Sequence, residues 1–320
     1  MTAPPPSHPG TAMATAAPPA RPRAATRTRR PRAVLWLLGP FFALFALTYI
    51  APMGYALVLS LYREKFTGIG WDGPTRVFAG AENYVRALTD PTFLTGTGRV
   101  LLYGLIYVPL VITLAAALAL LLDSALTAAR RFFHTVLFLP HIVPGLIAAI
   151  VWVYLYTPGL SPIIDGLEGL GAEVDFLGGN TVLLSLVNIA VWQSLGFNVV
   201  LIYVALRAVP ASTVEAARLD GAGELRTAVL VKLPQIRAAM FVVTLFTIIG
   251  SLQLFTEPQI VQSAGNSSVT STWTPNMLAY AAAFNSNDYH YAATVSVLIA
   301  ALAGVLSFTV TKLAHRRSAP

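Results

Sequence analysis

The sequence lacks cysteine altogether and is poor in charge. Only 11% of its 320 residues are Asp, Glu, Lys or Arg, against about 25% in a typical soluble domain, and 56% are hydrophobic. Without cysteine the chain has no disulfide, no thiolate metal site and no cysteine nucleophile. So little charge cannot coat a water-facing surface, which excludes a soluble enzyme and indicates a protein that crosses a membrane several times.

Six long stretches contain no Asp, Glu, Lys or Arg, and they meet or approach the roughly 20 residues that a helix needs to cross a bilayer. They are 33–62, 100–122, 132–164, 176–206, 238–256 and 289–311. Backbone amides find no water in lipid, and the runs show no strand-like alternation, so helices are expected rather than a barrel. The predicted fold class is an all-α polytopic membrane protein with six transmembrane helices.

The basic residues indicate the orientation of these helices. With a cytoplasmic amino terminus, the inner segments hold 16 of the 21 Lys and Arg residues. These segments are 1–32, 123–131, 207–237 and 312–320. We therefore expect a multi-pass protein of the plasma or inner membrane with both termini in the cytoplasm.

The two ends of the chain are predicted to lie outside the transmembrane domain. Residues 1–32 are rich in Pro, Ala and Thr and include six Arg, which predicts a disordered basic tail. Its Arg run fits a topology signal beside anionic lipid better than a nucleic-acid contact, so no nucleic-acid partner is expected. The apolar run that follows is too long for a cleaved signal peptide. The transmembrane domain is predicted over 33–313, and 314–320 form a short cytoplasmic tail.

One segment does not fit a plain series of spans and short loops. Residues 207–237 separate the fourth and fifth spans, whereas most connections run about 4–6 residues. Ser212 and Glu215 are spaced as a capping box, Gly221 is suited to end a short helix, and Pro234 limits a second one. The pattern predicts a cytoplasmic helix–turn–helix. The alternative, an amphipathic hairpin on the lipid headgroups, fits less well because acidic and basic residues are interleaved here.

The same segment resembles a known signature. Residues 215–222 read EAARLDGA and residues 231–234 read VKLP, which is similar to the EAA motif of ABC-importer permeases. Weaker matches in the expected order, such as Gly196-Phe-Asn198, extend the resemblance over roughly 33–312. Within that family the chain is most similar to carbohydrate-uptake permeases of the maltose and glycerol-phosphate type, the inner-membrane components of binding-protein-dependent transport.

This resemblance implies a function, partners and a coupling site. The chain would be a permease subunit that translocates a sugar, oligosaccharide or polyol derivative. Its expected partners are an ATPase dimer that binds ATP and Mg²⁺, a second homologous permease and an extracytoplasmic solute-binding protein. The residues that would contact the ATPase are Glu215, Ala216, Ala217, Asp220, Gly221, Leu233 and Pro234.

The chain itself offers no source of work for uphill transport. A phosphate-binding loop needs G-x-x-x-x-G-K-[ST], and none of the three lysines lies in such a context. An ion-coupled carrier would place ionisable groups near mid-membrane, but those within the predicted spans lie mostly near span ends. They are His134, His141, His290 and Glu257. We expect no bound cofactor, no metal site and no catalytic residue, and keep a stand-alone ion-coupled transporter or an intramembrane enzyme as alternatives.

A carbohydrate path needs amides for hydroxyl groups and aromatic faces for C–H surfaces. In the fourth and fifth spans the candidates are Asn188, Trp192, Gln193, Phe197, Asn198, Gln253, Phe255 and Glu257. Asn188 and Trp192 share a helix face at i,i+4 spacing, as Gln253 and Glu257 would. The alternative for each polar residue is a hydrogen bond between helices. For Glu257 an outer gate, a contact with the binding protein and pairing with a neighbouring subunit remain open.

Overall fold

The computed structural model describes residues 31–66, 74–124, 129–171 and 174–316. Most of the predicted N-terminal tail and the end of the predicted C-terminal tail lie outside the described residues. The chain divides into two units, Met1–Ala51 and Pro52–Pro320. The described part of the first unit holds α1 (Pro31–Phe45) and the π-helical turn η1 (Ala46–Ile50).

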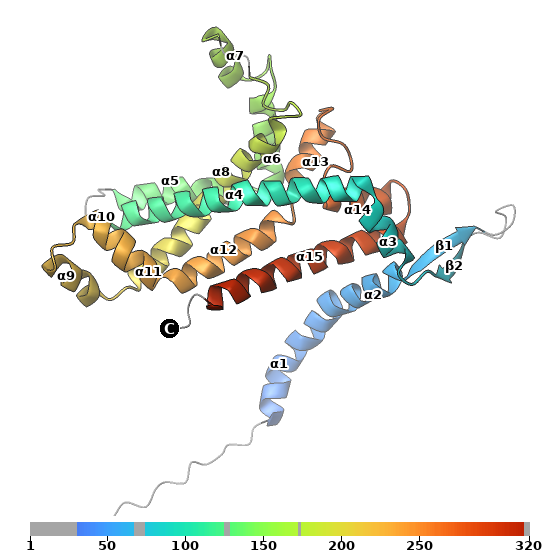
Figure 1. Cartoon of the computed structure of the whole chain (residues 1–320), viewed down its shortest axis with the longest axis horizontal. Helices are drawn as coiled ribbons and strands as arrows, with labels where there is room; N and C mark the ends of the chain where they lie inside the picture. Colours follow the sequence, from blue (N-terminus) through green and yellow to red (C-terminus); the bar gives the residue numbers. More distant parts are fainter. Residues whose placement is uncertain (1–30, 67–73, 125–128, 172–173, 317–320) are drawn as a thin grey trace, which may run out of the picture. The chain divides into compact units, whose positions relative to one another are not determined.

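The second unit holds the rest of the described elements, except that Ala51, the first residue of α2, belongs to the first unit (Figure 1). Its N-terminal half contains α2 (Ala51–Ser60), β1 (Tyr62–Phe66), β2 (Pro74–Phe78), α3 (Glu82–Thr89), α4 (Pro91–Asp123), α5 (Arg130–Ile142), α6 (Gly145–Tyr156) and α7 (Pro162–Gly169). Its C-terminal half contains α8 (Val182–Arg207), α9 (Ala211–Leu219), α10 (Glu224–Thr227), the π-helical η2 (Ala228–Lys232), α11 (Leu233–Gln235), α12 (Arg237–Ser251), α13 (Thr256–Ser263), α14 (Pro275–Phe284) and α15 (Tyr289–Arg316).

Each predicted apolar run is helical over most of its length, although 176–181 and 252–255 are not. Within the described residues, 5 helical stretches are long and apolar enough to cross a membrane, or up to 6 if the bent pair α5 and α6 is one span. The prediction of one helix over 132–164 is wrong, because α5 and α6 meet at 94° and the end of that run belongs to α7. Pro140 lies inside α5 and Pro144 precedes α6, and a proline removes a helical N–H donor.

Four long helices of the second unit form its centre. α8 and α12 pack on α4, and α15 packs on α12 (Figure 1). Small residues allow these contacts to be close: a Cβ on Gly104 of α4 would lie 2.9 Å from the Ser251 hydroxyl of α12. The core between α4 and α8 is built from buried apolar side chains that include Val111, Leu186 and Ile189.

The all-α prediction requires one correction. β1 and β2 form an antiparallel hairpin with Tyr62 opposite Phe78. The helix α3 that follows matches the helical spacing of its sequence, and its buried Asn83 side chain donates hydrogen bonds to the carbonyls of Ser60 and Tyr62, at 2.9 and 2.7 Å. This amide therefore joins the end of α2 to α3, and the hairpin begins at Tyr62, the last residue of the first apolar run.

A polar cluster joins α3, the start of α4 and the start of α15. The Asp90 carboxylate accepts hydrogen bonds from the Thr92 amide at 2.8 Å and from the Tyr291 hydroxyl at 2.7 Å. Partial burial raises the pKa of Asp90, but these hydrogen bonds lower it, and the net pKa lies below its ordinary value. Arg86 pairs with Asp288 at 2.9 Å and lies over the Tyr291 ring. These contacts hold the ends of three helices together.

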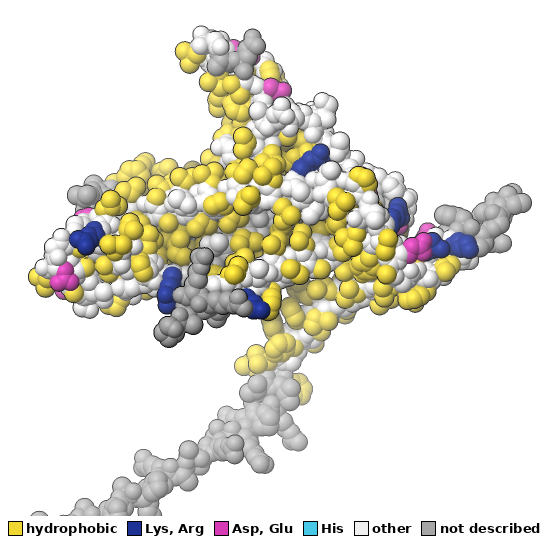
Figure 2. Space-filling model, in the orientation of Figure 1, with side chains coloured by type: hydrophobic (Ala, Val, Ile, Leu, Met, Phe, Trp, Pro, Cys, Tyr) yellow, Lys and Arg dark blue, Asp and Glu magenta, His cyan; other side chains and the backbone are white. Residues whose placement is uncertain are grey.

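The face of the second unit drawn in Figure 2 is largely apolar along the long helices, with charged side chains gathered toward their ends. Leu105, Phe246 and Phe308 are 71%, 69% and 69% exposed. Exposing this much apolar surface is favourable in lipid and unfavourable in water.

Candidate functional site: a coupling segment and a polar path

The predicted helix–turn–helix is present between α8 and α12. α9 is followed by a turn and then by α10, η2 and α11, which lead into α12. Figure 1 shows α9 and α10 at one end of α4 and α12, with α3 and α14 at the other end. Pro234 lies in α11, and the helix is interrupted at Ile236, where φ and ψ are −93° and 10°. The second helix therefore ends close to the predicted limit.

The start of α9 differs from the prediction. The helix begins at Ala211 with Pro210 as its N-cap, and no side chain caps it. Ser212 is consequently inside the first turn, so Ser212 and Glu215 do not form a capping box. The φ of Pro210 is −59°, and the fixed ring presets a helix start two residues earlier than Ser212 as N-cap would.

The end of α9 is a glycine-dependent turn. Gly221 has φ +82°. Its amide donates to the Arg218 carbonyl and the Ala222 amide donates to the Ala217 carbonyl, both at 3.0 Å. This pair of hydrogen bonds is the Schellman arrangement, which favours glycine at that position. The EAA motif and the glycine four residues beyond it thus form one compact turn.

The segment from α9 to α11, residues 211–235, is called the coupling segment after its expected role, and it exposes both the motif and large apolar side chains. Glu215, Ala216, Asp220, Gly221 and Pro234 are exposed, and Ala217 and Leu233 are half-buried. Three leucines on the same segment are also exposed: Leu219 by 90%, Leu225 by 79% and Leu230 by 62%.

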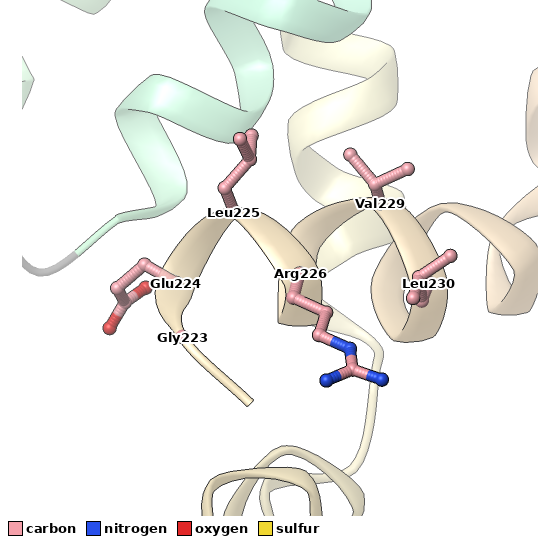
Figure 3. A pocket seen from close by; sticks show the side chains of 6 residues that line it. All are labelled: Gly223, Glu224, Leu225, Arg226, Val229 and Leu230. Carbon is pink, nitrogen blue, oxygen red and sulfur yellow. The ribbon is translucent and has the colours of Figure 1, made fainter. Parts of the chain in front are cut away.

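A surface hollow of about 610 Å³ lies against α10 and η2. Figure 3 shows that Leu225 and Val229 project from one side of this segment and Arg226 from the other. Such apolar exposure on a polar segment is typical of a surface that another protein covers.

The polar candidates on α8 fall into two environments. Asn198 is buried: its Nδ2 donates to the Ser194 carbonyl at 2.9 Å, and its Oδ1 lies 3.5 Å from the Thr247 hydroxyl of α12. Gln193 Nε2 donates to the Val143 carbonyl at 3.1 Å, where the helix is broken between α5 and α6. In both cases the amide joins α8 to a neighbouring helix, as the alternative interpretation held.

The remaining α8 candidates face aromatic side chains. Asn188 is exposed and its Nδ2 donates to the Tyr156 hydroxyl at 2.7 Å. Trp192 meets Trp152 edge to face, with ring centroids 5.8 Å apart. Phe197 stacks on His141 at 4.7 Å.

The candidates of the fifth span do not share a helix face. α12 ends at Ser251 and α13 begins at Thr256, so Gln253 lies in the break and Glu257 in the next helix. Their i,i+4 pairing is therefore wrong. Phe255 has an extended φ of −147° and packs against Tyr280, with ring centroids 5.5 Å apart.

Sequence reasoning missed one cavity. A hollow of about 400 Å³ is lined by Trp152, Tyr156, Phe176 and Asn188, among others. Tyr156 stacks on Phe176 with centroids 5.0 Å apart. Trp152 and Tyr156 are four residues apart in α6, the same spacing that singled out Asn188 and Trp192 in α8, and that spacing was the available signal.

Comparison with known proteins decides the family. The sequence profile described as "Binding-protein-dependent transport system inner membrane component" matches residues 111–320. This match covers well over half of the chain. The chain belongs to this family.

Relatives of this permease align over most of their length. A probable ABC transporter permease protein of Bacillus subtilis (strain 168) is 28% identical over 277 residues, which are 84% of this chain and 91% of the relative. The diacetylchitobiose uptake system permease of Streptomyces coelicolor is 29% identical over 299 residues, 87% and 82% of the two chains. The lactose transport system permease of Rhizobium radiobacter is 27% identical, over 88% and 94%.

Solved structures share the fold. A chain of a bacterial ABC transporter that imports the acidic polysaccharide alginate matches with a TM-score of 0.74 and 18% identity, over 89% of this chain and 98% of that one. A chain of the same kind of transporter, in complex with a periplasmic protein bound to an alginate pentasaccharide, matches with a TM-score of 0.75 and 17% identity, over 90% and 95%. The permease is thus a multi-pass membrane protein with the fold of ABC-importer permeases.

Proposed function

We propose that this chain is the membrane-spanning permease subunit of an ABC importer that carries a carbohydrate. The observation that carries the proposal is the coupling segment: a compact EAA turn beside leucines that are up to 90% exposed. A permease without a phosphate-binding loop depends on ATP hydrolysis by another protein. The exposed coupling segment is suited to contact that protein. The catalytic site, with ATP and Mg²⁺, then belongs to a separate ATPase dimer, and this chain binds no cofactor and is no enzyme by itself.

Some coupling residues can form hydrogen bonds with the ATPase, and others are small enough to let its backbone come close. Glu215 and Asp220 are exposed carboxylates that can accept hydrogen bonds from a partner. Ala216 and Gly221 are exposed and small, so a second backbone can come close to the turn. Leu233 and Pro234 lie where the segment joins α12, and we assign them to its placement rather than to contact.

The substrate class follows from relatives and from the aromatic cavity. The relatives are named for diacetylchitobiose, for lactose and, in Halalkalibacterium halodurans, for arabinooligosaccharides. In this chain the cavity beside Asn188 combines an amide with the rings of Trp152, Tyr156 and Phe176. Aromatic faces and a few amides suit the C–H surfaces and hydroxyl groups of a sugar. We propose this cavity, with Trp192 at its edge, as a carbohydrate contact, and Phe197, Gln253, Phe255 and Glu257 as further path residues.

The partners and the orientation complete the proposal. Both termini and the coupling segment face the cytoplasm, where the ATPase acts, and the solute-binding protein docks at the opposite end. A second homologous permease completes the transmembrane pathway. The exposed apolar faces of this chain contact the second permease and the surrounding lipid.

Co-purification tests the proposal directly. A tagged chain expressed with the ATPase, binding protein and second permease of its host should recover the ATPase in stoichiometric amount and accumulate labelled sugar in vesicles that contain ATP. Vesicles that hold this chain alone should accumulate none. Accumulation by the chain alone would contradict the proposal, as would recovery without an ATPase.

A further inference from the structure

A nearly buried ion pair lies where the coupling segment meets the long helices. Asp123 is the last residue of α4, and its carboxylate accepts from the Lys232 ammonium at 2.7 Å. The two side chains are only 7% and 12% exposed. A charge that has left water is stable only beside its partner, so this contact resists separation.

The partners of Asp123 come from segments far apart in sequence. Lys232 ends η2, the π-helical turn that follows α10, and Arg207 ends α8. The Arg207 guanidinium lies 3.9 Å from the other Asp123 oxygen and is 62% exposed. Asp123 thereby links α4 to the coupling segment by a buried contact and to α8 by a weaker, exposed one.

The route by which α9 can act on the long helices runs through this pair. α9 packs against η2 and α10. A cavity of about 210 Å³ separates it from the helix ends, lined by Glu215 and Arg218 of α9 and by Asp123, Arg207 and Lys232. Because η2 is π-helical and the helix breaks again at Ile236, the backbone between α10 and α12 is irregular and suited to bend. A displacement of α9 is therefore absorbed in that backbone unless something fixes η2 to α4.

We propose that Asp123 and Lys232 are positioning residues that transmit movement of the coupling segment to α4 and, through Arg207, to α8. The inference rests on the proposed function, since it requires an ATPase that moves α9. When the pair is intact, η2 and α4 move together. When one charge is removed, the coupling segment still binds its partner and ATP is still hydrolysed, but the helices no longer follow.

The test uses the complete transporter in proteoliposomes with binding protein, sugar and ATP. Sugar imported and ATP hydrolysed are measured on the same vesicles. Asp123→Asn and Lys232→Met should each lower the sugar imported per ATP by about tenfold while hydrolysis continues. Lys232→Arg keeps the cation and should retain most of the ratio. Arg63→Gln, which removes the exposed Arg63–Glu82 pair near the other end of the second unit, is the matched control and should leave the ratio unchanged.

The other possible results distinguish failure of the positioning role from failure of the proposed function. Unchanged ratios in both neutralising variants overturn the positioning role. So does equal loss of assembly in those variants and in Lys232→Arg, because that pattern indicates a contact needed only for folding. A wild-type chain that recovers no ATPase overturns the proposed function itself, before any variant is made.

Discussion

Two glycines of the coupling segment have different backbone conformations. Gly221 has φ +82° and no atom near its missing Cβ, whereas Gly223 has φ −69° and equally open space. An L-residue at Gly221 pays about 1 kcal/mol for the left-handed conformation, and at Gly223 a serine is a favourable N-cap of α10.

We therefore expect Gly221→Ser to lower ATP-driven uptake several-fold and Gly223→Ser to leave it near normal, measured as initial rates in proteoliposomes. Gly221→Trp adds bulk to the strained turn and should abolish uptake while membrane insertion remains intact. Equal effects of the two serine variants would show that the backbone conformation of the turn is irrelevant.

Two asparagines on α8 allow substrate contact to be separated from helix packing. Asn188 is exposed beside the aromatic cavity, and Asn198 is 4% exposed between α8 and α12. Removing a buried hydrogen-bonding group costs about 1 kcal/mol, whereas an exposed one costs little. Asn188→Ala should lower the uptake rate at saturating binding protein without changing the melting temperature in detergent. Asn198→Ala should lower the melting temperature. If Asn188→Ala instead lowered the melting temperature and left the uptake rate unchanged, Asn188 would not be a substrate contact.

At the scale of helices, α5 and α8 approach so closely that only glycine fits. A Cβ on Gly196 would lie 1.9 Å from the Leu137 carbonyl oxygen, whereas one on Gly250 of α12 would meet nothing within 4 Å. Gly196→Ala must push the two helices apart, which should destabilise the protein by about 3 kcal/mol. Gly250→Ala should stabilise it slightly, because alanine favours helix. Thermal unfolding of the purified chain in detergent distinguishes the two, and a stable Gly196→Ala protein would contradict this packing.

The same helices show what sequence can predict. Apolar runs predict helices because the backbone in lipid must bond to itself, and each run is helical over most of its length. Breaks are predicted less well: Pro140 and Pro144 indicate a disrupted helix but not its 94° bend. Nor do they indicate that the amide of the distant Gln193 donates to the Val143 carbonyl at the bend. Nor does sequence tell which polar residue faces a cavity. Asn188 and Asn198 point about 80° apart on α8, and only the neighbouring helices decide which is buried.

For the whole molecule, one ion cluster bears on how many times the chain crosses the membrane. Asp123 ends α4 and Arg207 ends α8, and the two side chains lie 3.9 Å apart. The ends of α4 and α8 therefore belong on the same side. A chain that returns to the same side after α8 must have crossed once between them, which favours the bent pair α5 and α6 as a true span and six crossings in total.

Because the chain has no cysteine, each introduced thiol is the single site of labelling. We expect Gly166→Cys in α7 and Ser286→Cys after α14 to react with an impermeant maleimide from outside intact cells. Ser212→Cys in α9 should react only after the membrane is opened. If α5 and α6 instead re-enter on one side, the positions exchange: Gly166→Cys becomes protected and Ser212→Cys reacts from outside. That result would place the EAA turn away from ATP, and no ATPase could act on it.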